Sequence, residues 1–364
     1  MTEVLLKELS NSDIDWMIAT GHRREIAANT VLVQEGKGAD SLHILLDGIL
    51  TVTVSQPENN PLARAFAAME GNETSSREIA RVSSGEVVGE IPFVSTRPTA
   101  TTVKAIEKSL VMSIPRQQLA AKLLSDVGFA SRFYHAIAIM LSDKLQSIIN
   151  QLGRSNQAQG QPLSDVLCVL GEMNDSDIDW MMATGNPQKI PADTVLIHEQ
   201  GSVDALYIIL GGIMSVSISE DKRNPLARAF AAIESGKISG REIARLSRGE
   251  IVGETLFIDG RLPCATVKAL EDSLVLSISR QQLAAKLQQD VGFASRFYRV
   301  IATLLSNRLL LMQSRLGYGR RIYSKGQSLD ENVDYEDELN TNVLDQVALA
   351  GKRFDWMQQR LKVS

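Results

Sequence analysis

Short apolar runs separated by glycine-containing turns mark the first 55 residues of the chain. Residues 30–34, 41–46 and 49–54 are rich in Val, Leu, Ile and Thr, and such runs favour β-strands. The preceding residues 12–20 carry an Ile-Asp-Trp-Met core behind a Ser or Asp suited to cap a helix, so they predict a short helix. This order of elements predicts a small antiparallel barrel rather than parallel strands alternating with helices.

The whole pattern is present twice, with an offset of 164 positions, as from Trp16 to Trp180 (180 − 16 = 164). The same offset relates Gly48 to Gly212, Glu90 to Glu254, and Tyr134 to Tyr298. The stretches NPLARAFAA, RQQLAAKL and DVGFASRFY are identical in both copies. Self-similarity at a fixed period indicates a duplicated domain. We expect one domain at residues 1–152 and a second at 165–318, joined by a polar, turn-rich linker at 153–164.

A helical period replaces the strand pattern in the second half of each copy, where helical segments are expected to begin at Arg116 and Arg280. Apolar residues recur there every three or four positions, which predicts a long helix with one apolar face. They are Phe133, Ile137, Leu141, Leu145, Ile148 and Leu152, and, in the second copy, Phe297, Ile301, Leu305, Leu309, Met312 and Leu316. The face packs either on its own barrel or against the matching helix of the other copy, and the sequence leaves both alternatives open.

Each copy also carries an inserted segment between strands, at residues 56–76 and 220–240. A proline followed by an alanine-rich run predicts a short helix in each insertion. The expected helices extend from Pro61 to Met69 and from Pro225 to Ile233. They either cover a sheet edge or bind a protein partner. That partner is another protein or a second copy of this chain, in which case the protein is a homo-oligomer.

The repeat ends near residue 318, and residues 319–364 form a tail. An acidic run comes first, and such runs are usually solvated. An amphipathic helix that contains Phe354 and Trp356 is expected after it. We expect this helix to dock on the body of the protein, with a protein partner as the alternative.

Composition and charge narrow the functional classes. The 364 residues are 44% hydrophobic with a net charge of −5, which argues against the basic surface that a nucleic-acid binder needs. The two cysteines, Cys168 and Cys264, are too few for a zinc site or a disulfide framework. The four histidines show no metal-ligand spacing, and no phosphate loop or serine-nucleophile motif is present. We therefore expect no catalytic residue, no metal and no membrane span, and we expect a cytoplasmic protein.

One stretch is nearly the same in both copies, as GEVVGEIPFVSTRPTATTVKA at residues 85–105 and GEIVGETLFIDGRLPCATVKA at 249–269. It resembles the phosphate-binding cassette of the cyclic nucleotide-binding domain family. In that family a glutamate holds the ribose hydroxyl, backbone N–H groups surround the cyclic phosphate, and an arginine pairs with its charge. The resemblance covers roughly residues 1–318. It implies a mainly β fold with helices (α+β), made of two tandem β-roll (double-stranded β-helix) domains with flanking helices.

The resemblance also implies candidate ligand-binding residues, and a cyclic nucleotide is the only candidate cofactor. Thr99 and Pro263 stand where the family has its arginine, and a cyclic phosphate without that cation loses a contact worth roughly 2–5 kcal/mol. Arg97 and Arg261, two positions earlier, either restore the charge or are surface residues. The candidates are Gly89, Glu90, Arg97, Thr99 and Thr101, and, in the second copy, Gly253, Glu254, Arg261, Cys264 and Ala265. The two glutamates could equally cap backbone amides of the cassette.

Tandem domains of this kind occur in kinase regulatory subunits, and related single domains occur in transcription factors of the catabolite activator type. More loosely, the chain looks like the bacteriocin-type transport-associated proteins of bacteria. The missing arginines favour a non-enzymatic regulatory or scaffold protein with degenerate pockets that acts through protein contacts. The alternative is a genuine sensor of cAMP, cGMP or another anion, which signals through helix movement. A DNA-binding regulator fits less well, because the tail is too short for a winged helix-turn-helix.

Overall fold

The computed structural model describes residues 2–55, 76–94, 99–152, 171–219, 240–315 and 341–361. The expected inserted helices, the expected linker and Arg97 lie outside the described residues. The chain divides into two compact units. Unit 1 comprises Met1–Met140 and Leu310–Asn340, and unit 2 comprises Leu141–Leu309 and Thr341–Ser364. Each unit holds one copy of the repeated strand pattern.

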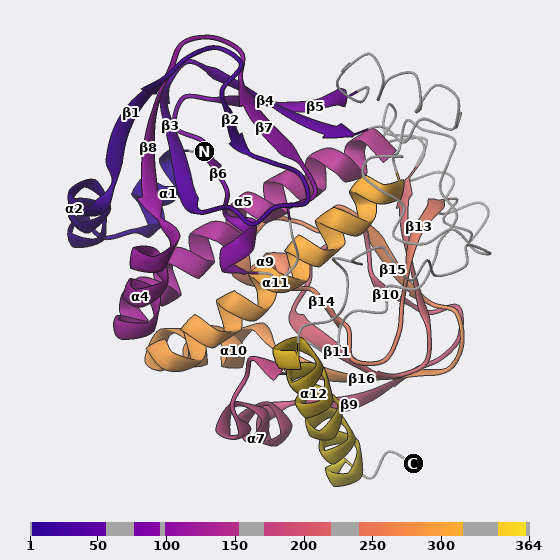
Figure 1. Ribbon diagram of the computed structural model, residues 1–364. Helices are drawn as coiled ribbons and strands as arrows, with labels where there is room; N and C mark the ends of the chain where they lie inside the picture. The colour runs from indigo at the N-terminus through magenta and orange to yellow at the C-terminus, as the bar shows by residue number, and fades with distance from the viewer. Residues whose placement is uncertain are drawn as a thin grey trace. The chain divides into compact units, whose positions relative to one another are not determined.

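Unit 1 opens with two short helices and continues into strands that form two sheets (Figure 1). Its elements are α1 (Thr2–Glu8), α2 (Asn11–Thr20), β1 (His22–Ile26), β2 (Val31–Val33), β3 (Ser41–Asp47), β4 (Ile49–Ser55), β5 (Ser76–Ser83), β6 (Val87–Val88), η1 (Ile91–Phe93), β7 (Thr102–Ala105) and β8 (Ser109–Pro115). The sheet orders are β1-β8-β3-β6 and β2-β7-β4-β5, and neighbouring strands are antiparallel. This roll confirms the expected antiparallel barrel.

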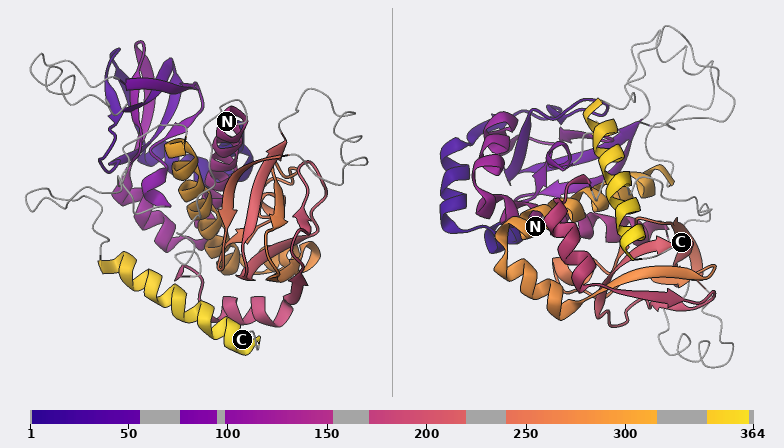
Figure 2. Two further views of the ribbon diagram at one scale, coloured as in Figure 1. Left: turned by 90° about the vertical axis from the view of Figure 1, so that its right-hand side faces the viewer. Right: turned by 90° about the horizontal axis from the view of Figure 1, so that it is seen from below.

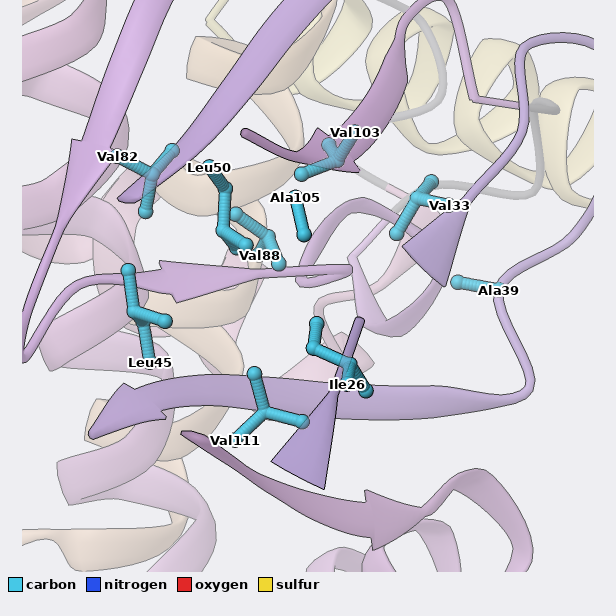
Figure 3. Packing of buried hydrophobic residues seen from close by; sticks show 10 residues of the cluster. All are labelled: Ile26, Val33, Ala39, Leu45, Leu50, Val82, Val88, Val103, Ala105 and Val111. Carbon is cyan, nitrogen blue, oxygen red and sulfur yellow. The ribbon is translucent and has the colours of Figure 1, made fainter. Parts of the chain in front are cut away.

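The core of unit 1 consists of aliphatic side chains from both sheets. Its buried members are Ile26, Val33, Ala39, Leu45, Leu50, Val82, Val88, Val103, Ala105 and Val111. Figure 3 shows these side chains projecting toward one another from several strands. Leu45 and Leu50 are 0% exposed, and truncation of such a leucine to alanine costs roughly 2–5 kcal/mol. The packed strands therefore give the cassette turn between β6 and β7 a rigid support.

Unit 2 repeats this architecture strand by strand. Its elements include α7 (Asp175–Thr184), β9 (Asn186–Ile190), β10 (Val195–Ile197), β11 (Ala205–Gly211), β12 (Met214–Ser219), β13 (Gly240–Leu246), β14 (Ile251–Val252), α9 (Thr255–Ile258), β15 (Thr266–Ala269) and β16 (Ser273–Ser279). The sheet orders are β14-β11-β16-β9 and β10-β15-β12-β13. Even the register is kept, because His43 pairs with Ser113 in unit 1 and Tyr207 pairs with Ser277 in unit 2. The duplication thus extends to individual strand pairs.

Helices follow the strands of each copy, as expected from the change of period. They are α4 (Arg116–Ser125), α5 (Val127–Leu152), α10 (Arg280–Gln289) and α11 (Val291–Arg315). The shorter and the longer helix of the first copy meet at Asp126, whose carboxylate accepts a hydrogen bond from Phe129 N at 2.9 Å at the start of α5. The expected apolar face is buried, with Phe133, Ile137 and Leu141 each 0% exposed. The pairing of α5 with α11 stays a prediction.

A buried aspartate ties the first helix of each strand pattern to the long helix. Asp13 is 3% exposed, accepts from Ser10 N at 2.9 Å, and accepts from Arg132 of α5 at 2.6 and 3.0 Å. Burial alone would raise the pKa of Asp13, but hydrogen bonds from Arg132 and Ser10 hold that pKa below its usual value. Unit 2 repeats the pair with Asp177 and Arg296, at 2.5 and 2.9 Å. A charge-assisted pair therefore fixes α2 and α7 in place.

A buried histidine should make unit 1 sensitive to mild acid. His43 on β3 is 4% exposed, and its Nδ1 lies 2.8 Å from Ser113 Oγ. Burial, together with the charge of Arg24, lowers the pKa of His43 to about 4. The unfolded chain binds a proton near pH 6.5 and the folded chain only near pH 4, so stability falls as the pH falls through this window. We expect the protonation of His43 to lower the free energy of unfolding by about 2 kcal/mol between pH 7 and pH 5.

Urea unfolding of the wild type and of His43→Gln at both pH values measures this cost. Glutamine keeps a polar group near Ser113 but does not titrate. On acidification from pH 7 to pH 5, we therefore expect the free energy of unfolding of His43→Gln to fall by about 2 kcal/mol less than that of the wild type. An equal loss in the two proteins would show that another group is responsible.

The last helix, α12 (Thr341–Arg360), packs on unit 2 alongside α7 (Figures 1 and 2). Phe354 and Met357 are 0% exposed. Trp356 is 39% exposed, with the Arg360 guanidinium 5.1 Å from its ring centroid. Docking on the body, expected for the tail helix, is confirmed, although Phe354 and Met357 rather than Trp356 provide the buried anchor.

Candidate functional site

A glycine in the left-handed region opens each cassette turn. Gly89 follows β6 with a φ of +81°, and Gly253 follows β14 with a φ of +85°. A Cβ on Gly89 would lie 2.7 Å from Ser41 O, and one on Gly253 would lie 2.6 Å from Ala205 O. Only glycine fits here, because the backbone needs a positive φ and approaches a neighbouring strand closely.

Replacing Gly253 with alanine should destabilise the protein more than the same change at Gly260. Gly260 also has a positive φ, +72°, but a Cβ there meets nothing within 4 Å. Gly260→Ala therefore carries only backbone strain of about 1–2 kcal/mol, whereas Gly253→Ala adds a collision with the Ala205 carbonyl. We expect a loss about twice as large for Gly253→Ala in denaturant unfolding. Equal losses would mean that the Ala205 contact relaxes freely.

The two cassette glutamates are buried, Glu90 at 4% exposure before η1 and Glu254 at 6% exposure before α9. Glu254 Oε1 accepts a hydrogen bond from Arg308 Nη1 at 2.7 Å. Arg308 Nη2 also donates to Ile251 O at 2.5 Å, and the Arg308 side chain is only 13% exposed. The carboxylate that the resemblance assigns to a ribose hydroxyl is thus held by a guanidinium of its own unit.

Sequence reasoning missed Arg308 because it lies on α11, 54 positions after Glu254. The matching position of the first copy holds Lys144 (308 − 164 = 144), so both copies place a cation there. Lys144 is three positions after Leu141 and four before Ile148, on the face expected to be apolar. A cation repeated on an apolar helix face is the signal that could have found Arg308.

Thr99 and Pro263, which stand where the family has its arginine, form hydrogen bonds with the turn between the second and third strands of each roll. Thr99 is 5% exposed, and its Oγ1 lies within hydrogen-bonding distance of Gln34 O and Lys37 O, at 2.7 and 2.8 Å. Thr99 O accepts from Gly36 N at 2.8 Å. In unit 2, Pro263 O accepts from Gln200 N at 2.8 Å, in the matching place (36 + 164 = 200). These residues fasten the turn and supply no positive charge.

Arg261, the candidate replacement for the missing arginine in unit 2, is engaged by two carboxylates. Its Nε donates to Asp259 Oδ2 at 2.5 Å, and its Nη1 donates to Asp143 Oδ1 of the same unit. The hydrogen bond with Asp259 raises the pKa of Arg261 above its usual value. A ligand phosphate would therefore have to displace these carboxylates before Arg261 could bind it.

The other candidates contribute less to the cassette than expected. Thr101 and Cys264 are partly exposed, and Ala265 is 9% exposed. The following residues, Thr102 and Thr266, do make structural contacts, because their Oγ1 atoms accept hydrogen bonds from Glu35 N and Glu199 N, each at 3.1 Å. Sequence reasoning missed these two.

The charged side chains at Glu254 and Arg261 of the second cassette are engaged in ion pairs. Two cations, Arg308 and Arg261, stand against three carboxylates, those of Glu254, Asp259 and Asp143. These five charges sum to −1. Glu250 adds another carboxylate, and Lys268, the remaining cation of residues 249–269, pairs with Asp193 at 2.6 Å, so an incoming phosphate monoanion finds no uncompensated positive charge among the described residues of this cassette. A cyclic phosphate needs such a charge or a full set of donors to replace its hydration.

Neither a metal site nor a membrane-spanning helix is found in the part of the chain that the structure describes. Within it, no group of three or more His, Cys, Asp or Glu residues is arranged to hold a metal ion. Its helices include none with the length and apolar character that a membrane span requires.

Comparison with known proteins identifies the repeated unit. A family model described as cyclic nucleotide-binding domain matches residues 23–126 and 187–290. Among curated proteins, the chain is similar to the cAMP-activated global transcriptional regulator CRP of Salmonella typhimurium, with 22% identity over 151 residues. The match covers 41% of this chain and 63% of that protein, so the chain spans less than two thirds of that relative's length.

Solved structures resemble the chain at low identity. One is the regulatory domain of Toxoplasma gondii PKA with cAMP, with 17% identity, a TM-score of 0.28, and coverage of 79% of this chain and 89% of that one. Another is a cyclic nucleotide-binding domain from Methylobacillus flagellatus, with 19% identity, a TM-score of 0.35, and coverage of 42% and 82%. None of these matches supports the narrower likeness to bacteriocin-type transport-associated proteins. The family model, which matches each copy once, is the stronger finding.

Proposed function

We propose that this chain, which belongs to the cyclic nucleotide-binding domain family, is a non-enzymatic regulatory or scaffold protein that acts through protein contacts. In this proposal its second pocket no longer binds a cyclic nucleotide. The observation that carries the proposal is the ion pair between Glu254 and Arg308, at 2.7 Å. It holds the glutamate that would otherwise bind a ribose hydroxyl.

Two costs oppose nucleotide binding in unit 2. A ribose hydroxyl must replace Arg308 at Glu254, and that exchange breaks a buried pair whose partners are 13% and 8% exposed. The phosphate must then be bound where Pro263 supplies no cation, at a loss of roughly 2–5 kcal/mol. Together these costs are enough to raise the dissociation constant of a site from micromolar to above millimolar.

A second candidate function, a cyclic-nucleotide sensor, is favoured by one difference between the copies. The position that matches Asp259 in the first copy holds Ser95 (259 − 164 = 95). The first copy therefore lacks the nearby carboxylate that accepts a hydrogen bond from Arg261 Nε in the second copy. A sensor would accordingly bind its ligand in the first cassette, through Glu90 and Arg97.

Calorimetric titration of the full chain with cAMP and with cGMP tests the proposal. We expect no heat of binding up to millimolar ligand, because Glu254 is paired with Arg308 and because Thr99 and Pro263 stand where the family has its phosphate-binding arginine. Micromolar binding that Arg97→Ala abolishes and Arg261→Ala leaves intact would make the protein a sensor through its first copy. Binding that requires Arg261 would show that the second pocket is functional and the proposal wrong.

A further inference from the structure

The outer face of α2 in unit 1 is exposed, whereas the matching face of α7 in unit 2 lies beneath α12. Ile18 is 59% exposed, and its counterpart Met182 is 8% exposed (18 + 164 = 182). Ile14 is half-buried, and its counterpart Ile178 is 1% exposed. The duplicated fold thus has two equivalent apolar faces, one on α2 and one on α7. The face on α7 is covered by α12 (Figure 2).

The helix that covers the α7 face, α12, is held there by apolar side chains and, at one end of the contact, by Arg353. Phe354 and Met357 are completely buried. Arg353 Nη1 donates to Gly171 O at 3.1 Å, and its Nε donates to Asp175 Oδ1 at 3.0 Å. This end of the contact therefore pairs a cation of α12 with the start of α7.

The last turn of α12 makes a second set of polar contacts. Gln358 Nε2 donates to Leu210 O at 2.7 Å, and Arg360 Nη1 donates to Asp179 Oδ1 at 3.0 Å. A helix C-terminus carries partial negative charge, so a basic residue there is favourable for the helix and for its pairing with Asp179. The α7 face thus selects an amphipathic helix with a basic last turn.

The corresponding surface of unit 1, which we call the α2 face, keeps the apolar part and gains a carboxylate. It comprises Lys7, Asn11, Ile14, Asp15, Ile18, Leu46 and Asp47. Asp15 is exposed and matches Asp179, and Asp47 is exposed where unit 2 has Gly211. Because Asp179 and Leu210 contact the last turn of α12, a helix docked in the same way on the α2 face would meet two carboxylates at its last turn.

The other end of the α2 face has the opposite charge pattern from unit 2. Asn11 stands where unit 2 has Asp175, and Lys7 stands where it has Gly171. An arginine at the position of Arg353 would therefore lose its carboxylate and meet a cation. This mismatch disfavours α12 of a second copy as the occupant.

We propose that the α2 face binds an amphipathic helix of a partner protein. That helix has an apolar stripe to cover Ile14 and Ile18, basic residues in its last turn to pair with Asp15 and Asp47, and an acidic residue to face Lys7. This is the helix-in-groove mode, in which apolar anchors give affinity and rim charges select the partner. The inference deepens the proposed function, because it names a protein partner for the scaffold, and it is tested without any nucleotide.

The probe is a fluorescent peptide with the sequence of residues 341–364 and the change Arg353→Glu. Glutamate at this position suits Lys7 and Asn11 of the α2 face and would be repelled by Asp175 of the α7 face. We expect one peptide to bind each full-length chain in an anisotropy titration. The substitution Ile18→Lys should weaken binding about tenfold or more, because it places a cation in the apolar contact opposite a basic helix.

Leu124→Lys is the matched control, since Leu124 is 85% exposed near the end of α4 and lies outside the α2 face. It should leave the affinity unchanged, and thermal melting of both variants checks that they fold. No binding of the probe, or equal binding by Ile18→Lys, would overturn the proposal. The unchanged 341–364 peptide should bind about tenfold more weakly than the probe. Tighter binding of that peptide, lost in Ile18→Lys, would identify a second copy as the occupant and contradict a separate partner.

Discussion

Replacement of Asp13 by alanine is expected to lower the free energy of unfolding by about 3 kcal/mol. The change removes the acceptor of two hydrogen bonds from Arg132 and of the Ser10 N–H at the start of α2. Asp13 is 3% exposed, but the Arg132 side chain is 39% exposed and is partly solvated after the change. The loss is therefore placed at the lower end of the range for a broken buried pair.

Urea unfolding at pH 7 measures this loss, and Glu25→Ala is the control. Glu25 pairs with Lys108 at 2.8 Å, but their side chains are 66% and 71% exposed, and such surface pairs contribute little. Because the pKa of Asp13 is lowered on folding, the advantage of the wild type is present above the unfolded pKa of 3.8 and is lost as the pH falls further. A loss at pH 7 no larger than that of Glu25→Ala would contradict the prediction.

Much of the fold could be predicted because its determinants are local. Alternation and turn glycines mark the strands, and a fixed offset of 164 residues gives the duplication without any structural knowledge. The sequence indicates more than one helical segment after the strands, but not the residue at which α4 ends and α5 begins. That boundary depends on Asp126, which accepts from Phe129 N, and an aspartate inside a helical pattern can equally lie on its exposed face.

The candidate site was less predictable because its decisive contacts join distant segments. The motif identifies Glu254 and Arg261 as residues of the cassette. It gave no information about their partners, Arg308 on α11 and Asp143 on α5, which lie 54 and 118 positions away. These side chains reach the turn only because α5 and α11 pack next to it.

The same reasoning explains the tail. Aromatic residues near the C-terminus predicted docking, but periodicity alone does not say which face of α12 is covered. Phe354 and Met357, three positions apart, share the buried face, and Trp356 stays 39% exposed. The asymmetry between the units, in which α7 is covered and Ile18 is exposed, has no signature in a single copy of the repeat.

Replacement of Arg308 by methionine is expected to have the largest effect, a loss of about 3–5 kcal/mol at pH 7. Both side chains of the pair are shielded, at 13% exposure for Arg308 and 8% for Glu254. The change leaves the Glu254 carboxylate buried without its cation, and it leaves Ile251 O without the donor at 2.5 Å. The loss is measured by urea unfolding of the full chain.

Removing both charges should restore most of this stability. In the double variant Glu254→Leu with Arg308→Met neither charge of this pair remains, and Arg308 Nε, which has no partner among the described residues, is no longer a cost. A coupling free energy of about 2 kcal/mol or more between the two positions would identify the pair as a structural lock. If Glu254 instead serves a ligand, Arg308→Met should be tolerated and should bind cAMP more tightly than the wild type does. Loss of stability without any gain in cAMP binding therefore supports a scaffold, because it shows that the family's ribose-binding carboxylate has become part of the core.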